Sequence, residues 1–273
     1  MKQILLAFVF AVSASAQVRY AVGQNVAPVF EGWERNADGS FNMVFGYMNR
    51  NYEEEVDVPV GAANAFEPGA ADQGQPAHFY ARRQQFVFKV RVPKDWGKKD
   101  LVWTLTSHGK TEKAYASLMP VWEIDAGTYQ QNRGGPGELG ELDDPPAITL
   151  TGVAERSIAV ADTLALSTTV TDDGRPTARR SGGGSNARVE GPLKQAVVRL
   201  DPDMKLGVIW VVYRGNASAV TFNPRKVKVA NGKADTTVRF SAPGTYVLRG
   251  YADDGILWDA VDVTVTVRGD SSR

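Results

Sequence analysis

The strongest chemical signal in this chain is a pair of Asp-Asp-Gly sequences, Asp172-Asp173-Gly174 and Asp253-Asp254-Gly255. Calcium binds six to eight oxygens, often from loop carboxylates and carbonyls, so two such turns at one end of a domain could share an ion. Asp-Gly is also ordinary turn chemistry, and the EF-hand spacing D-x-[DN]-x-[DN]-G is missing. The sequence therefore favours plain turns, leaves calcium open and assigns no metal ligand.

Other catalytic and cofactor chemistries have weaker signals. The two histidines, His78 and His108, stand in separate predicted loops, and no H-E-x-x-H or Cys accompanies them, so we interpret both as solvated loop residues rather than zinc ligands. No G-x-S-x-G elbow occurs, and the glycine-rich residues 181–185 lack the lysine of a phosphate-binding loop. We predict no catalytic residue, no cofactor and no enzyme; a hydrolase with an unrecognised site in residues 59–83 is the least favoured alternative.

The first 16 residues read as a secretory signal peptide. Lys2 precedes a short apolar run, residues 4–12, and Ala14-Ser15-Ala16 is a small-x-small cleavage site. No later stretch has the ~18 apolar residues of a membrane helix. We therefore expect an exported protein that begins at Gln17 and is periplasmic, associated with the outer envelope, or extracellular.

The amino-acid composition limits the classes of partner and of chemistry that the chain can have. The 273 residues contain 31 Lys plus Arg and 31 Asp plus Glu, so no overall charge favours nucleic acid or an anionic membrane. Cysteine is absent, which removes disulfides, thiolate nucleophiles and cysteine–zinc sites. The length suits two β-sandwiches, each large enough to bury a core without disulfides.

Residues 19–124 are predicted to form a first β-sandwich. Period-two alternation is strong in three segments, whose inward residues are Phe41, Met43, Phe45 and Tyr47; Phe86, Phe88, Val90 and Val92; and Leu101, Trp103 and Leu105. Glu53, Glu54 and Glu55 are interpreted as a solvated strand edge. Residues 59–83 have no periodicity and are predicted to be a long loop. Its Phe66, Phe79 and Tyr80 either pin the loop to the sandwich or, with its arginines, form a binding surface.

Residues 125–146 are predicted to be an acidic, flexible linker. Gly134, Gly135 and Gly137 favour turns, and Pro145-Pro146 excludes regular helix at the exit. A second sandwich then spans residues 147–268, interrupted by a basic, glycine-rich insertion at 175–205. Its organising segment is residues 236–255, two alternating strands around Pro243-Gly244, which predicts an antiparallel pair with one buried face.

The second sandwich resembles the PKD-like, immunoglobulin-type repeats of secreted bacterial proteins. The resemblance rests on TVTDDG (169–174), WVVYRG (210–215), AVTF (219–222), TTVRFSAPGTYVLRGYADDG (236–255) and DVTVTV (262–267). It implies a spacer, adhesion or binding module and brings no catalytic residues with it; the insertion departs from the pattern. The first domain resembles, more weakly, an N-terminal region of uncharacterised secreted bacterial proteins, which implies no activity.

The fold class is thus all-β: two tandem immunoglobulin-like antiparallel sandwiches joined by an acidic Gly/Pro linker. Trp210 is expected in the core and Tyr246 at a tyrosine corner. The expected function is a non-catalytic structural, adhesion or binding module whose partner is another envelope protein or a cell-surface glycan. The alternative is carbohydrate binding by exposed aromatic residues of the first domain, with these candidates: Trp33, Tyr47, Phe79, Tyr80, Trp96 and Trp103.

Overall fold

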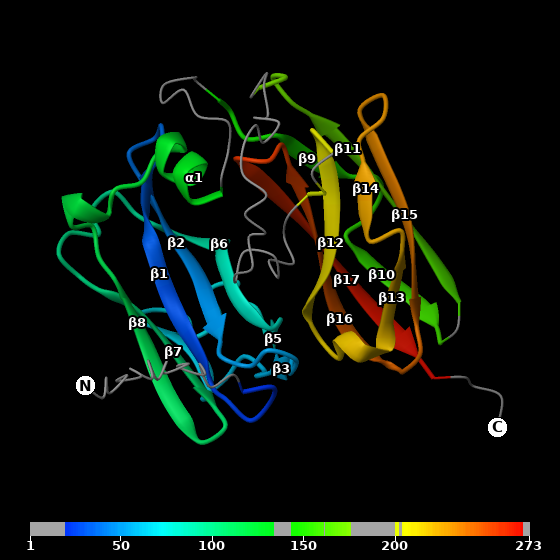
Figure 1. The fold of residues 1–273 in the computed structure, drawn as a ribbon, viewed down its shortest axis with the longest axis horizontal. Coiled ribbons are helices and arrows are strands. Elements are labelled where there is room, and N and C mark those ends of the chain that lie inside the picture. Colours follow the sequence, from blue (N-terminus) through cyan, green and yellow to red (C-terminus); the bar gives the residue numbers. More distant parts are fainter. Residues whose placement is uncertain (1–19, 134–142, 161, 176–199, 202–203, 270–273) are drawn as a thin grey trace, which may run out of the picture.

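The structure, a computed structural model, describes residues 20–133, 143–160, 162–175, 200–201 and 204–269. The predicted signal peptide and most of the predicted insertion lie outside these residues. Within them the chain forms two β-sandwiches that lie side by side (Figure 1). No helix in the described part of the chain has both the length and the hydrophobicity to cross a membrane.

The N-terminal sandwich contains two three-stranded sheets and a two-stranded ribbon. One sheet has the order β1 (Val26–Arg35), β2 (Phe41–Asn49), β6 (Arg82–Val92), and the other β4 (Asn64–Glu67), β7 (Leu101–Ser107), β8 (Lys110–Ala116). The ribbon pairs β3 (Val56–Asp57) with β5 (His78–Phe79). Alternate residues of β2, β6 and β7 fill the core as predicted, because their apolar side chains share one face.

Two expectations for this sandwich are wrong. Phe86 does not share the face of Phe88: its backbone has a left-handed φ of 52° and its side chain packs outside this core, against Tyr129. Residues 59–83 are not a plain loop, because they contain β4 and β5 and the start of β6. The hairpin between β7 and β8 is as predicted, with positive φ at His108 and Gly109.

The C-terminal sandwich packs a five-stranded sheet on a four-stranded sheet. The first has the order β10 (Glu155–Ala159), β17 (Trp258–Arg268), β16 (Gly244–Asp253), β12 (Gly207–Arg214), β14 (Lys226–Lys228). The second has the order β13 (Val220–Asn223), β15 (Lys233–Phe240), β11 (Thr163–Thr171), β9 (Ala147–Leu150). Strand β10, which was not predicted, runs parallel to β17, and the other pairs are antiparallel.

The two aromatic residues predicted to hold this core do so. Trp210 is fully buried, and the residue opposite it in β16 is Gly250, where an added Cβ would lie 3.1 Å from the indole. The glycine therefore makes room for the indole in an antiparallel sheet. The Tyr246 hydroxyl donates to the carbonyl oxygen of Ala242 at 2.9 Å, which closes the predicted tyrosine corner.

The segment between the sandwiches differs from the predicted flexible linker. Residues Ala126–Arg133 form helix α1, preceded by the short 3-10 helix η1 (Pro120–Trp122). Asp125 caps α1 by accepting the backbone N–H of Thr128 at 2.8 Å. The buried Tyr129 then anchors the helix to the N-terminal sandwich by donating its hydroxyl to Glu34 at 2.6 Å. The prolines predicted to exclude helix lie after this element and do not reach it.

Candidate functional site: the seam between the two sandwiches

Strand β12 joins the two sandwiches because both of its faces are buried. Val208, Trp210 and Val212 point into the C-terminal core. Ile209 and Val211 belong to a separate apolar cluster that also contains Val44, Tyr80 and Phe86 of the N-terminal sandwich. We call this contact between the sandwiches the seam. The unbroken apolar run of β12 is typical of a strand buried on both sides.

Two tyrosine hydroxyls cross the seam. The backbone N–H of Val212 donates to the Tyr80 hydroxyl at 2.9 Å, and the Tyr251 hydroxyl donates to the carbonyl oxygen of Val87 at 2.9 Å. Burial raises the pKa of both tyrosines to about 12. Each hydroxyl therefore stays protonated at neutral pH, and each satisfies a buried backbone group across the seam.

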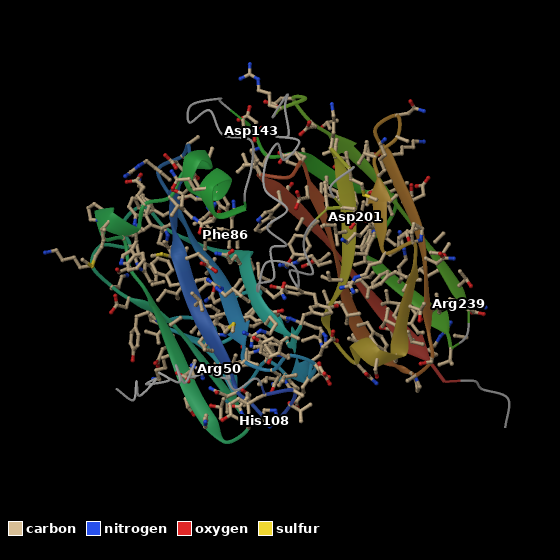
Figure 2. The ribbon with its side chains drawn as sticks, in the orientation of Figure 1. Arg50, Phe86, His108, Asp143, Asp201 and Arg239 are labelled. Carbon is tan, nitrogen blue, oxygen red and sulfur yellow. The ribbon has the colours of Figure 1, made fainter. Side chains whose placement is uncertain are left out.

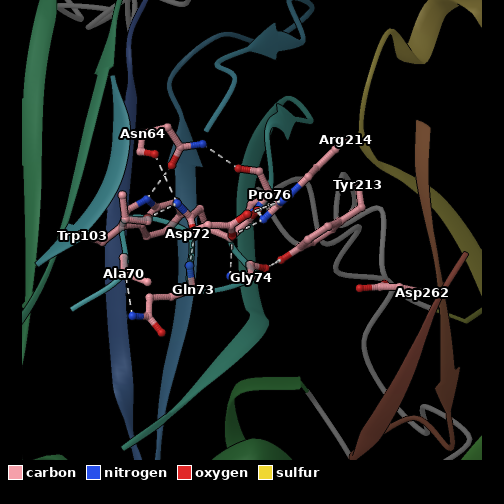
Figure 3. Close-up of polar contacts among 12 residues, drawn as sticks. Asn64, Ala70, Asp72, Gln73, Gly74, Pro76, Trp103, Tyr213, Arg214 and Asp262 are labelled. Carbon is pink, nitrogen blue, oxygen red and sulfur yellow. Dashed lines mark hydrogen bonds and ion pairs between the residues drawn. The ribbon is translucent and has the colours of Figure 1, made fainter. Parts of the chain in front are cut away.

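The segment predicted to be a long loop also contacts β12 (Figure 3). The Tyr213 hydroxyl donates to the carbonyl oxygen of Gly74 at 2.6 Å. The backbone carbonyl oxygen of Tyr213 accepts the N–H of Ala77 at 3.0 Å. Arg214 forms a bidentate ion pair with Asp72, at 2.9 and 2.7 Å. Phe66, Phe79 and Tyr80 are buried, so they pin this segment rather than form an exposed surface.

His78 stands beside the seam and is not the solvated residue that we expected. It is 4% exposed, its Nδ1 lies 2.7 Å from Asp57, and its Nε2 lies 3.0 Å from Glu55. Burial alone lowers the pKa of His78, but the hydrogen bonds and charges of the two carboxylates outweigh it, so the net pKa is raised. The arrangement stabilises a charged imidazolium. His108 is exposed as predicted and pairs with Glu54 at 3.0 Å.

Glu54 and Glu55, which were interpreted as part of a solvated strand edge, also form specific contacts. Glu54 also accepts the backbone N–H of Gly23 at 2.5 Å, and Glu55 is a direct partner of His78. Both side chains hold neighbouring segments in place. The spacing of charges in the sequence carried no signal for these contacts, because the partners come from distant segments.

A cleft of about 670 Å³ is lined by residues of α1, of the N-terminal sandwich and of the start of β17. Glu34 lies on its wall and accepts the Lys89 ammonium at 2.9 Å. That ammonium also lies 5.3 Å from the ring centre of Trp258 and 5.7 Å from that of Tyr129. The volume suits a small ligand, and on the wall Lys89 is paired with Glu34 and Arg35 with Glu123.

Each acidic turn has a neighbour in the segment that contains Asp143, which Figure 2 shows at the upper end of the molecule. The backbone N–H of Asp144 donates to Asp173 at 3.5 Å, which connects the linker to the first turn. Asp254, in the second turn, has Asp143 and Asp253 as charged neighbours. Burial first, and then these two carboxylates, raise the pKa of Asp254 to about 7.

Both turns use the local hydrogen bonds expected of Asp-Gly sequences. Asp172 accepts the N–H of Gly174 at 2.9 Å, and Asp253 accepts that of Gly255 at 2.6 Å. No group of three or more Asp, Glu or His side chains among the described residues is placed to hold a metal ion. The local hydrogen bonds of Asp172 and Asp253 therefore account for the backbone conformation of both turns without a metal ion. They leave the second carboxylate oxygen of Asp172 and of Asp254 without a hydrogen bond.

The six aromatic residues considered as a platform for sugars do not lie on the surface. All six candidates are at most 8% exposed, because they fill the N-terminal core or the seam: Trp33, Tyr47, Phe79, Tyr80, Trp96 and Trp103. The exposed aromatic residues of this sandwich are Tyr20, Tyr115 and Trp122, within the described chain. Alternation with Leu101 and Leu105 was the sequence signal that placed Trp103 inside. The glycine-rich residues 181–185 and the arginines 179, 180 and 188 lie outside the described residues.

No protein-family model and no curated protein matches this chain. Solved structures similar to it include an immunoglobulin-domain complex of titin and obscurin-like 1 (11% identity, TM-score 0.28, 48% of this chain and 100% of that one). A second is the structure of the eight N-terminal immunoglobulin domains of DSCAM (10% identity, TM-score 0.27, 90% of this chain and 27% of that one). A third is the structure of fibronectin(III)-like modules of Clostridium thermocellum CbhA (12% identity, TM-score 0.27, 89% of this chain and 93% of that one). The strand order of the C-terminal sandwich, with β10 parallel to β17, independently defines an immunoglobulin-like fold.

Proposed function

We propose that this chain is an exported, non-catalytic structural or adhesion module in which two sandwiches act as one stiff unit. The observation that carries the proposal is the burial of both faces of β12: Ile209 and Val211 would be solvent-exposed if the sandwiches moved independently. A spacer or adhesion module transmits position and force, so a fixed angle between its domains serves that role. An apolar interface with satisfied hydrogen bonds is what fixes such an angle.

Export is the second part of the proposal, supported by the charge, apolar run and cleavage site of residues 1–16. The PKD-like motifs of residues 147–268 agree with a secreted bacterial module. Its proposed partner is another envelope protein, since the aromatic residues considered for glycan binding are buried.

Small-angle scattering of the mature protein tests the stiff unit. The wild-type curve should fit the single arrangement of Figure 1. Val211→Asp places a charge in the seam and should broaden the distribution of sizes, because a buried unpaired charge is strongly unfavourable. Thr169→Asp, on the exposed face of β11, is the matched control and should leave the curve unchanged. A wild-type curve that requires a wide range of domain angles would reject the proposal.

Export has a separate readout. Expressed with its own N-terminus in a bacterial host, the protein should be recovered outside the cytoplasm with the mass of a chain that starts at Gln17. Full-length protein that stays in the cytosol would reject this part while leaving the scattering result intact.

A further inference from the structure

The turn that follows β8 presents large apolar side chains to solvent. Val121 is 76% exposed and Trp122 47%, Met119 beside them is also exposed, and η1 buries none of its residues. Of the seven large apolar side chains that are exposed in the described chain, three lie in this one turn. Single exposed apolar residues are ordinary, but a contiguous group of them marks an interaction surface. We call Met119–Trp122 the knob.

The fold holds the backbone of the knob in place while leaving its side chains uncovered. The Trp33 indole N–H donates to the carbonyl oxygen of Met119 at 2.9 Å, and the N–H of Ile124 donates to the carbonyl oxygen of Trp33 at 2.9 Å. Gly32 permits this close approach, because a Cβ there would lie 2.6 Å from the carbonyl oxygen of Trp122. A surface that is already fixed loses little conformational entropy on binding, so the knob is prepared for a contact.

A hollow with matching chemistry lies on the C-terminal sandwich. Its volume is about 440 Å³, and it is bounded by the start of β13, the end of β15 and Val160, which lies between β10 and β11. The lining is mostly apolar. Arg239 also lines it, exposed and without an ion pair in the described part of the chain. A guanidinium beside apolar surface suits an aromatic partner, because it stacks on the face of an indole.

The knob and the hollow lie at opposite ends of the molecule. Strand β8, which leads into the knob, is at the left of Figure 1, and Figure 2 shows Arg239 at the right-hand edge in the same orientation. One copy therefore cannot bring its own knob to its own hollow. Two different surfaces that fit each other across copies make a heterologous contact, which extends from one copy to the next.

We propose that the knob of one copy inserts into the hollow of a second copy, so that the chains associate head to tail. Trp122 stacks on Arg239 of the next copy, and Val121 covers the apolar lining. The contact deepens the structural role proposed above and rests on it, because a stiff two-sandwich unit turns such contacts into an ordered series. The contact is small, so the association is weak and depends on concentration.

Sedimentation velocity of the mature protein, from about 0.01 to about 1 mM, tests the contact. Val121→Asp places a charge on the knob, and Thr221→Tyr fills the hollow with a side chain of its own. Both positions are exposed and lie outside the seam, so each variant should keep the wild-type scattering curve at low concentration. Val153→Asp, at another exposed apolar residue, is the matched control.

We expect the wild type and Val153→Asp to form larger species as the concentration rises, while Val121→Asp and Thr221→Tyr each stay monomeric. An equimolar mixture of Val121→Asp and Thr221→Tyr should stop at the dimer, because each pair retains one intact knob and one intact hollow. Association of the wild type should also protect Trp122 from quenching by acrylamide, since the other five tryptophans are at most 8% exposed.

Three results would overturn the contact: a wild type that is monomeric at about 1 mM, association that survives either variant, or a mixture that stays monomeric or grows beyond the dimer. None of them bears on the stiff unit, because the scattering curve of the monomer tests that proposal by itself. A wide range of domain angles in the monomer, with association intact, would instead reject the stiff unit and the ordered series built on it.

Discussion

The two sheets of the C-terminal sandwich differ in how buried their outward-facing side chains are. Along β15 the outward residues Lys233, Asp235 and Arg239 are exposed, and the strand alternates strictly. Along β12 the outward residues Ile209 and Val211 are as buried as the inward ones. Both strands pack on the same core, so the difference comes from the N-terminal sandwich, which covers only the five-stranded sheet. Loss of alternation in a strand therefore marks the face that contacts a neighbour.

The largest effect should come from the inner face of β12. Trp210→Ala should lower the free energy of unfolding by about 3–5 kcal/mol, because it leaves a large cavity between the two sheets. Chemical denaturation monitored by circular dichroism measures this loss. A variant as stable as the wild type would mean that the indole is not in the core.

Truncating a side chain on the outer face of β12 should lower the free energy of unfolding nearly as much as truncating one in the core. Ile209→Ala should lower the free energy of unfolding by about 2–4 kcal/mol, since this side chain is fully buried in the seam. Thr169→Ala, on the exposed face of β11, should change it by no more than about 0.5 kcal/mol. Equal, small effects at both positions would show that the two outer faces do not differ.

A smaller effect should follow the protonation of His78 beside the seam. The pKa of His78 is raised above its ordinary value of 6.5, so the folded state favours the charged imidazole. The stability that this contributes is fully present below pH 6.5 and is lost as the pH rises through the folded-state pKa. The free energy of unfolding, measured from pH 5 to 9, should decline in this way in the wild type and in His108→Gln. In His78→Gln this part of the decline should be absent.

Much of the fold could be predicted because local patterns report local structure. The alternation in β2, β7 and β15 predicted inward faces that the structure confirms, and the Pro243-Gly244 turn correctly predicted the hairpin with Tyr246 at its corner. Trp210 was predicted inside because an apolar strand surrounds it. Along β7 and β15 one face contacts the core of the same sandwich and the other is more exposed, which is the situation that period-two alternation describes.

The seam could not be predicted, because its partners are far apart in the sequence. The alternation of residues 246–252 predicted one buried face, yet Tyr251 on the other face is fully buried and bonds to Val87. Phe86 was placed on the wrong face because one left-handed residue reverses the pattern. The apolar run 206–213 was the available signal: a strand with no polar face requires a second neighbour.

Differential scanning calorimetry of the mature protein tests the central claim, that the seam makes two sandwiches into one unit. We expect a single transition in which the calorimetric enthalpy equals the van't Hoff enthalpy, because neither sandwich can unfold without exposing the outer face of β12. Val211→Asp should split that transition into two. Two separate transitions in the wild type, each insensitive to Val211→Asp, would contradict it.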